Sequence, residues 1–182
     1  ITIPTVDAKL RPHDLESVKS NIGNQHAPQP GIVAITQVTE LGALYSVEEI
    51  RALSDAAHAL GMHVYLDGAR IANATAALGG TREALRSFTR DAGVDAMTFG
   101  CTKAGGIFGE AVVFFNHSFT DRSIYVRKQV TQLPSKVRYI SAQFSALLAD
   151  ELWITNARHA NAMATHLYEQ TVEIPGVQLN VA

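Results

Sequence analysis

The sequence predicts an α/β fold, in which a mostly parallel sheet has helices on both faces. Short apolar runs of strand length alternate along the chain with segments whose apolar residues have helical spacing, and this alternation is typical of parallel sheets. Two of the runs stop on a charged residue that small residues follow, as buried strands do at the carboxyl end of such a sheet. The chain has 182 residues, 47% hydrophobic and 18% charged, which is an ordinary globular composition with enough apolar side chains for a core.

The first quarter of the chain contains a short helix, a strand and the start of a longer helix. Residues 12–22 carry apolar side chains at spacings of three and four, which predicts a short amphipathic helix, and residues 32–38 form an apolar run of strand length. Residues 39–45 are predicted as a turn at the carboxyl end of that strand, facing the crevice at the strand ends. Ser46 and Glu49 have the spacing of a capping box, which predicts the start of the next helix.

The order of strand and helix then repeats until about residue 119. The sequence predicts strands at residues 62–66, 94–99 and 110–116, the last a returning strand, and helices at residues 71–78 and 81–89. The run 139–168, rich in Ala and Leu, is predicted as one helix or as two in succession. Within it, Trp153 is expected to pack against the sheet or against a partner subunit.

Charge and cysteine content narrow the classes of partner. A net charge of −2 and a pI near 6.4 give no electrostatic case for nucleic acid or an anionic membrane, and no apolar run approaches the ~18 residues of a membrane span. We therefore expect neither partner.

The single cysteine, Cys101, excludes an internal disulfide and favours a reducing, cytoplasmic setting. Because no base accompanies Cys101, we favour a small packed residue over a nucleophile. The chain starts in mid-pattern and ends at residues 179–182 as if inside a strand, so we expect an internal piece of a longer protein.

Two strand ends carry the residues with chemistry. One apolar run ends on Asp67, within Tyr-Leu-Asp-Gly-Ala-Arg, and another is followed by Lys103, within Cys-Thr-Lys-Ala-Gly-Gly. An acid and an amine at one crevice suit pyridoxal phosphate (PLP), which needs a lysine to hold its aldehyde as a Schiff base and a carboxylate facing its pyridine nitrogen. Each residue also has a common structural interpretation, the Asp as a helix cap and the Lys as a solvated side chain.

Four segments carry a resemblance to a known family. ITQVTELGALYSVEEIRALS, YLDGARIANATAALG, VDAMTFGCTKAGG with GEAVVFFN, and ELWITNARHANAMA closely resemble the low-specificity L-threonine aldolases of bacteria, which are PLP enzymes with the aspartate-aminotransferase fold. The resemblance runs from about Ile32 to Val177. It implies that residues 1–138 belong to a PLP-binding large domain, and that residues 139–182 form a helical connection to a small C-terminal domain. It also implies a homodimer or homotetramer, because the family builds each site across a dimer interface. In addition, it implies that a phosphate-binding turn and a His that stacks on the cofactor ring lie upstream of this chain.

The resemblance assigns roles to three residues at the strand ends. Lys103 matches the lysine that carries PLP, and we expect it to be buried, because burial lowers the pKa of an ammonium group and frees the amine. Asp67 matches the partner of the pyridine nitrogen, whose protonation it favours. Arg70 matches the residue that binds the α-carboxylate of the substrate, a task suited to a two-pronged donor. An ion pair between Arg70 and Asp67 is the alternative.

The remaining candidate contacts are with the phosphate group of PLP. Arg138 resembles the arginine that reaches the phosphate from a neighbouring subunit, with Lys136 as the competing candidate. Thr102 is a candidate phosphate donor or a purely structural residue. Glu40 matches a crevice turn of the family and receives no role, and no metal is expected.

The implied reaction is retro-aldol cleavage of L-threonine or L-allo-threonine, or a related substrate such as phenylserine, to glycine and an aldehyde. Two alternatives stay open. One is another PLP-dependent reaction of an amino acid, β-elimination or transamination, because one fold hosts many activities. The other is a PLP-fold protein that binds a partner or metabolite without catalysis.

Overall fold

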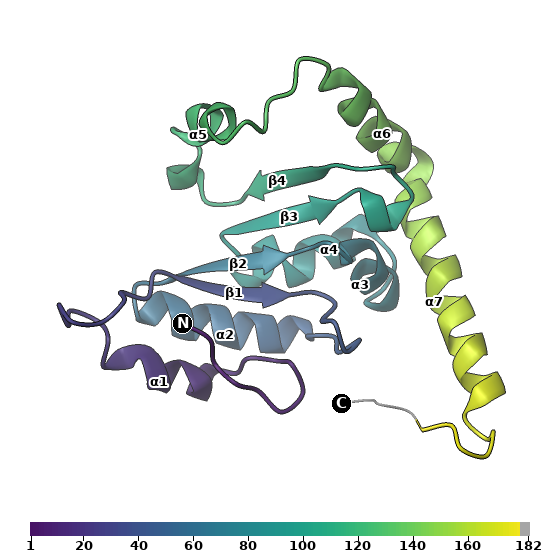
Figure 1. Ribbon diagram of the computed structural model, residues 1–182, viewed down its shortest axis with the longest axis horizontal. Helices are drawn as coiled ribbons and strands as arrows, with labels where there is room; N and C mark the ends of the chain where they lie inside the picture. The colour runs from purple at the N-terminus through teal and green to yellow at the C-terminus, as the bar shows by residue number, and fades with distance from the viewer. Residues whose placement is uncertain (179–182) are drawn as a thin grey trace.

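The computed structural model describes residues 1–178, and their core is a four-stranded sheet (Figure 1). The strands lie in the order β1 (Ile32–Thr36), β2 (His63–Asp67), β3 (Ala96–Gly100) and β4 (Glu110–Phe114). The first three strands are parallel, and β4 is antiparallel to β3. The mostly parallel sheet and the returning last strand are therefore confirmed, and each strand ends within two residues of its predicted bounds.

The connections between strands explain this topology. α2 (Val47–Ala59) joins β1 to β2, while α3 (Ile71–Ala77), α4 (Arg82–Phe88) and the short η2 (Arg90–Ala92) join β2 to β3. Parallel neighbours need such long crossovers. Between β3 and β4 stand only η3 (Thr102–Ala104) and a short loop, which are too short for a crossover, so β4 returns antiparallel.

The predicted caps begin two of these helices. The Ser46 hydroxyl accepts a hydrogen bond from the Glu49 amide at 3.2 Å, and the Ser46 amide donates to the Glu49 carboxylate at 2.8 Å, which is the reciprocal capping box. Thr81 caps α4 by accepting from the Ala84 amide at 3.1 Å. Both caps are confirmed.

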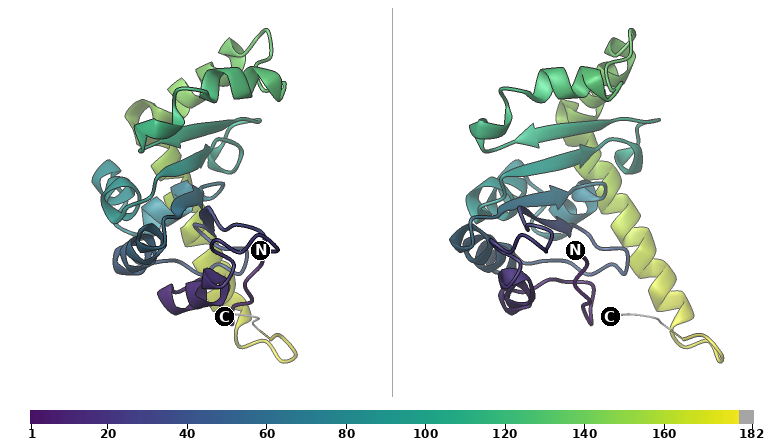
Figure 2. Two further views of the ribbon diagram at one scale, coloured as in Figure 1. Left: turned by 90° about the vertical axis from the view of Figure 1, so that its left-hand side faces the viewer. Right: turned by 60° about the vertical axis from the view of Figure 1, so that its left-hand side comes forward.

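The two faces of the sheet differ in cover. The buried face is formed by alternate residues of β1 to β3, namely Val33, Ile35, Val64, Leu66, Met97 and Phe99. In Figure 2, α2, α3 and α4 lie together on one side of the sheet. On the opposite face Ile32 is 63% exposed and Val112 is 55% exposed. Within residues 1–178, helices therefore cover one face of the sheet more fully than the other. The strands alternate apolar side chains on the covered face with more polar ones, such as Tyr65 and Thr98, on the open face.

The N-terminal segment adds a small helical unit beside α2. It consists of η1 (Pro12–Leu15) and α1 (Glu16–Lys19), and it buries Leu15 and Val18 in the core. The helix predicted over residues 12–22 stops three residues early. Ile22 has no core to cover and is 45% exposed, and Gly23 leaves the helical conformation with a φ of +76°.

After the sheet come η4 (His117–Phe119) and α5 (Ser123–Gln129). The run predicted at residues 139–168 then forms two helices in succession, one of the two predicted alternatives: α6 (Arg138–Leu148) and α7 (Leu152–Thr171), with η5 (Ala149–Glu151) between them. Asp150 and Glu151 break the run with φ values of 48° and 57°. Trp153 is 1% exposed, and its ring centroid lies 5.2 Å from that of Phe99 on β3. Trp153 therefore packs against the sheet rather than a partner.

α7 passes the carboxyl ends of the parallel strands (Figure 1). Three side chains of α7 donate to backbone carbonyls of segments that follow β2 and β3: Asn156 to Ala104 in η3, Arg158 to Gly80 between α3 and α4, and Asn161 to Asn73 in α3. No helix of residues 1–178 is both long enough and apolar enough to span a membrane. The predicted strand-like end at residues 179–182 lies outside the described residues.

The buried carboxylate of Asp95 connects several segments of the chain at the amino end of the parallel strands. Asp95 is 8% exposed and accepts hydrogen bonds from the Val64 amide at 2.8 Å, His58 Nε2 at 2.8 Å and Asn116 Nδ2 at 3.0 Å. Burial alone would raise the pKa of Asp95, but these hydrogen bonds outweigh it and lower the pKa to about 2. His58 is thus one of the hydrogen-bond partners of this carboxylate.

Candidate active site

Asp67 is the last residue of β2. Its Oδ1 accepts a hydrogen bond from the Ala69 amide at 2.9 Å, and its backbone carbonyl accepts from the Gln37 amide at 3.0 Å. Its Oδ2 has no hydrogen-bond partner among residues 1–178. One oxygen therefore fixes the turn after the strand, and the other is available to a ligand.

Two glycines bring this turn against β3. A Cβ on Gly68 would lie 2.0 Å from the Thr98 carbonyl oxygen, and a Cβ on Gly100 would lie 2.8 Å from the Ala69 carbonyl oxygen. The Gly68 amide also donates to Thr98 Oγ1 at 3.1 Å. Only residues without a side chain permit this approach, so the ends of β2 and β3 meet closely.

Lys103 lies in η3, directly after β3. Both Thr102 and Lys103 are exposed, and within the described range Lys103 Nζ has neither a hydrogen bond nor an ion pair. The expectation that Lys103 is buried is therefore wrong. Its side chain is open to solvent in η3 at the end of β3.

A hydrogen bond from α7 anchors the turn that carries Lys103. Asn156 Nδ2 donates to the Ala104 carbonyl at 2.9 Å, and the Gly106 amide donates to the Cys101 carbonyl at 3.0 Å. Gly105 has a φ of +116°, a conformation that favours glycine. The backbone of this exposed turn is thus fixed although its lysine side chain is free.

Arg70 follows Asp67 by three residues and points to a different acid. Its Nη1 donates to Glu40 Oε1 at 3.2 Å and to the Val38 carbonyl at 3.4 Å. The alternative ion pair with Asp67 is not formed. Arg70 Nε and Nη2 have no partner in the part of the chain that the structure describes, so one edge of the guanidinium is open.

Two glutamates that received no role from the sequence join this neighbourhood. Hydrogen bonds from the backbone amide of Glu40 and from Arg70 lower the pKa of Glu40, and the charges of Arg70 and Lys103 lower it further. Partial desolvation and the charge of Asp67 raise the pKa of Glu110, against the opposing charge of Lys103. These mutual effects indicate that both acids share one electrostatic environment with Lys103.

A sequence signal existed for only one of the two. Glu40 follows β1 in the turn predicted to face the crevice, so its position was readable. Glu110 lies opposite Gly100 in the antiparallel ladder, and that register places it on the same open face as Asp67. The register depends on the β3–β4 loop and is not visible in the local sequence.

Arg138 and Cys101 complete the predicted positions. Arg138 is exposed at the start of α6, and its guanidinium carbon lies 5.0 Å from the ring centroid of Tyr139. In residues 1–178 it has no hydrogen bond to Asp67 or Lys103, and the structure does not favour it over Lys136, which is also exposed. Cys101 is fully buried, and burial raises the pKa of its thiol, so it is a packed residue as expected.

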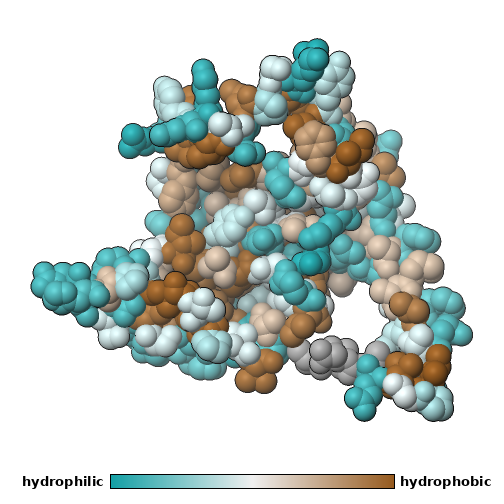
Figure 3. All heavy atoms as spheres, in the orientation of Figure 1, coloured by the Kyte–Doolittle hydropathy of each residue, from teal (hydrophilic) through white to brown (hydrophobic). Residues whose placement is uncertain are grey.

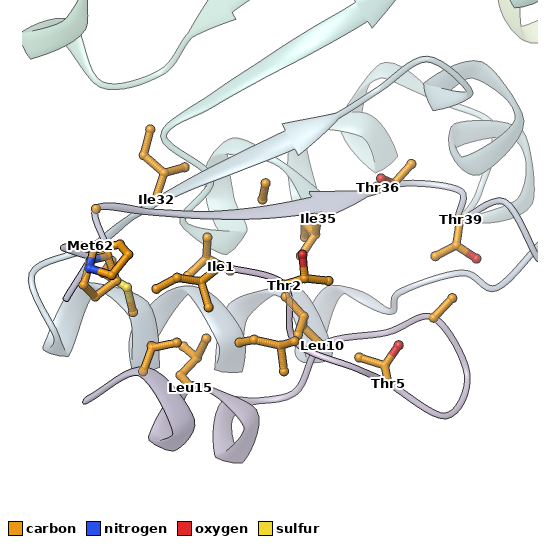
Figure 4. A pocket seen from close by; sticks show the side chains of 18 of the residues that line it. Ile1, Thr2, Thr5, Leu10, Leu15, Ile32, Ile35, Thr36, Thr39 and Met62 are labelled. Atoms are coloured by element: carbon orange, nitrogen blue, oxygen red, sulfur yellow. The ribbon is translucent and has the colours of Figure 1, made fainter. Parts of the chain in front are cut away.

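Cavities lie beside this crevice rather than in it. One of about 480 Å³ runs between the N-terminal segment and β1 (Figure 4), and of the crevice it reaches only Thr36, Thr39 and Glu40. Another of about 440 Å³ lies between α4, α6 and the covered face of the sheet. Neither is lined by Asp67 or Lys103, so neither cavity is the candidate site.

Comparison with known proteins places this geometry in a family. The model of the beta-eliminating lyase family matches residues 2–182. A low-specificity L-threonine aldolase from Pseudomonas sp. (strain NCIMB 10558) is 40% identical over 179 residues, which cover 98% of this chain and 51% of that protein. The low-specificity L-threonine aldolase of Pseudomonas aeruginosa is 39% identical over 171 residues, 94% of this chain and 49% of that protein. The chain thus spans about half the length of these relatives.

Solved structures agree with this result. A threonine aldolase of Leishmania major superposes with a TM-score of 0.89 at 31% identity, covering 100% of this chain and 52% of that one. A putative L-allo-threonine aldolase of Listeria monocytogenes has a TM-score of 0.72 at 20% identity, covering 97% of this chain and 45% of that one, and supports the fold alone. The resemblance and the fold class inferred from the sequence are confirmed, and the chain belongs to the beta-eliminating lyase family.

Proposed function

We propose that this chain carries the cofactor and substrate site of a PLP-dependent L-threonine aldolase. The reaction is retro-aldol cleavage of L-threonine, L-allo-threonine or a related β-hydroxy-α-amino acid such as phenylserine, and the products are glycine and an aldehyde. The names of the Pseudomonas relatives support this activity. The observation that carries the proposal is a set of polar groups without partners in residues 1–178, namely Asp67 Oδ2, Lys103 Nζ and the Nε–Nη2 edge of Arg70.

These groups fit PLP. Lys103 would be the amine that holds the cofactor, Asp67 would face its ring nitrogen, and Thr102 would be a donor to its phosphate. Arg138 of a second subunit is a further phosphate ligand. When bound, PLP supplies an electron sink for the carbon that loses its substituent.

The side chains of the chain itself perform two tasks in this proposal. The open edge of Arg70 binds the α-carboxylate through two parallel hydrogen bonds and orients the bond to be broken. The negative charge of Asp67 keeps a proton on the ring nitrogen, a preference of roughly 1 to 3 pK units for a close opposite charge.

The rest of the molecule is proposed as the family resemblance implies. Residues 1–138 belong to the large domain, residues 139–182 lead to a small C-terminal domain, and the protein is a cytoplasmic homodimer or homotetramer. Directly after α7, the apolar side chains of Val172, Ile174 and Val177 are 38%, 48% and 41% exposed. Figure 3 shows apolar surface at this end of the helix.

The test is to incubate the protein expressed from its complete gene with PLP, reduce it with borohydride and map the labelled peptide. We expect the label on Lys103 and no label in the Lys103→Ala variant. A label elsewhere contradicts the assignment of Lys103.

Product analysis then separates the reactions. Glycine and an aldehyde from L-threonine support the aldolase, whereas pyruvate and ammonia from L-serine indicate β-elimination. A keto acid together with the aminated cofactor indicates transamination. A labelled protein that forms no product from any of these amino acids indicates binding without catalysis.

A further inference from the structure

Glu40 has a defined relation to Arg70 that the proposed reaction does not yet use. Both hydrogen bonds of the Arg70 side chain come from Nη1, one to Glu40 Oε1 at 3.2 Å and one to the Val38 carbonyl at 3.4 Å. A guanidinium has five donors in a fixed plane. Anchoring at Nη1 therefore fixes the plane and leaves the Nε–Nη2 edge without a partner in the described residues.

The turn that carries Glu40 is itself well anchored. The side chain of Gln37 is fully buried, accepts from the Tyr45 amide at 3.0 Å and donates to the Tyr45 carbonyl at 2.9 Å. Thr39 closes the turn, since its hydroxyl accepts from the Ala43 amide at 3.0 Å and its amide donates to the Ala43 carbonyl at 3.0 Å. Glu40 is thus attached to a framework that ends β1.

The ion pair between Glu40 and Arg70 is too exposed to be explained by stability. Glu40 is 71% exposed and Arg70 is 30% exposed at their side chains, and pairs of this kind contribute little to folding. Hydrogen bonds and nearby positive charges lower the pKa of Glu40, so its carboxylate remains a charged acceptor at neutral pH. A carboxylate that stays charged and accepts a hydrogen bond from Arg70 is suited to orienting that arginine.

We propose that Glu40 is a positioning residue that holds Arg70 by Nη1, so that the Nε–Nη2 edge is ready for the α-carboxylate of the amino acid. This role rests on the proposed function. Pre-orientation improves binding because the arginine loses less conformational freedom when the substrate arrives. The competing role is a carboxylate that occupies Arg70 and must leave before substrate binds.

The test measures amino-acid binding separately from turnover in the PLP-loaded full-length protein. Glycine is titrated while the absorbance spectrum of the bound cofactor is followed, and KM and kcat are measured with L-threonine. We expect Glu40→Ala to raise the Kd of glycine and the KM of L-threonine about tenfold, as expected for loss of a charge-assisted hydrogen bond. We expect kcat to change less than about twofold, because the chemical groups are untouched.

Two further variants separate positioning from a general effect. Glu40→Gln keeps an oxygen acceptor and is expected to recover most of the affinity. In an Arg70→Ala background, Glu40→Ala is expected to cause no further loss, since it acts only through the missing arginine. Asp91→Ala is the matched control, because Asp91 forms a similarly exposed ion pair with Arg86 at 3.1 Å outside the crevice.

Three results overturn the positioning role. A lower KM in Glu40→Ala identifies Glu40 as a competitor of the substrate carboxylate. An unchanged Kd leaves Glu40 without influence on Arg70, and an equal loss in the Arg70→Ala background assigns its effect to another group. A wild-type protein whose cofactor spectrum does not respond to glycine contradicts the proposed function itself, and the role of Glu40 with it.

Discussion

Asp67 performs a structural and a proposed chemical task with different oxygens of one carboxylate. Oδ1 holds the Ala69 amide at 2.9 Å, and Oδ2 is open to the cofactor nitrogen in the proposed site. Removing the whole side chain would disturb both tasks. An isosteric change can separate them, because asparagine keeps the oxygen that holds the turn and loses the charge.

We therefore predict that Asp67→Asn keeps the fold and binds PLP but loses turnover of L-threonine by about tenfold to a thousandfold, the range set by 1 to 3 pK units. Steady-state kinetics and the absorbance of bound PLP measure the two effects. Turnover close to that of the wild type would contradict the assignment of Asp67 to the ring nitrogen.

Asp95 gives a prediction about stability at the opposite end of the sheet. Its hydrogen bonds lower the pKa from 3.8 to about 2, so the folded state prefers the ionised form. This stabilisation is fully present above about pH 4 and is lost as the pH falls toward 2, and it amounts to about 2 kcal/mol.

We expect Asp95→Asn to be less stable than the wild type by about this amount at pH 7, and the difference to disappear near pH 2. Urea denaturation at several pH values measures it, with Asp91→Asn as the exposed control. A difference that is independent of pH would mean that packing, rather than ionisation, explains the effect.

At the scale of elements, side chains of α7 form hydrogen bonds with the backbone of the segments that follow β2 and β3. Asn156 binds the Ala104 carbonyl in the turn of Lys103, whereas Asn161 donates to the Asn73 carbonyl at 3.1 Å and accepts from Asn73 Nδ2 at 2.8 Å, away from that turn. The two asparagines share one helix and one type of bond. They differ in the segment they bind, since Asn156 binds the turn with the proposed catalytic lysine and Asn161 binds helix α3.

This pair predicts a selective effect. Asn156→Ala is expected to weaken PLP binding about fivefold to tenfold, in line with the roughly 1 kcal/mol of one hydrogen bond, and Asn161→Ala to leave it unchanged. Equilibrium dialysis of PLP measures both affinities. Equal losses in the two variants would show that α7 stabilises the domain as a whole rather than the Lys103 turn.

At the scale of the whole molecule, we propose that the site includes a residue of a second subunit. Arg138 has no hydrogen bond to Asp67 or Lys103 within residues 1–178, and its guanidinium lies over the ring of its neighbour Tyr139. Its proposed role at the cofactor phosphate is in the site of a second subunit, as the family resemblance implies. This arrangement can be tested by mixing two inactive variants.

We predict that Lys103→Ala and Arg138→Ala proteins, each nearly inactive, regain activity when they are unfolded and refolded together. In a symmetric dimer half of the molecules are hybrids, and each hybrid has one site with both residues intact, which gives about a quarter of the wild-type activity. No recovery would mean that Arg138 acts within its own subunit. Substantial activity of Arg138→Ala alone would exclude it as a phosphate ligand and favour Lys136.

The sequence by itself determined the elements and the chemistry that each strand end carries. The Ser46 capping box and the strand that ends on Asp67 could be predicted because their signals lie within a few neighbouring residues. The resemblance to the family followed from the same local segments. Hence the fold class was predictable without any knowledge of contacts.

Only the tertiary structure decided which groups meet. The pairing of Arg70 with Glu40 rather than Asp67, the position of Glu110 opposite Gly100, and the exposure of Lys103 all depend on register and on which face of the sheet is covered. Those properties arise from contacts between residues far apart in the chain, for which periodicity and capping carry no signal. A residue's type and neighbours therefore indicate what it can do, while the packing of distant segments determines the partner with which it does so.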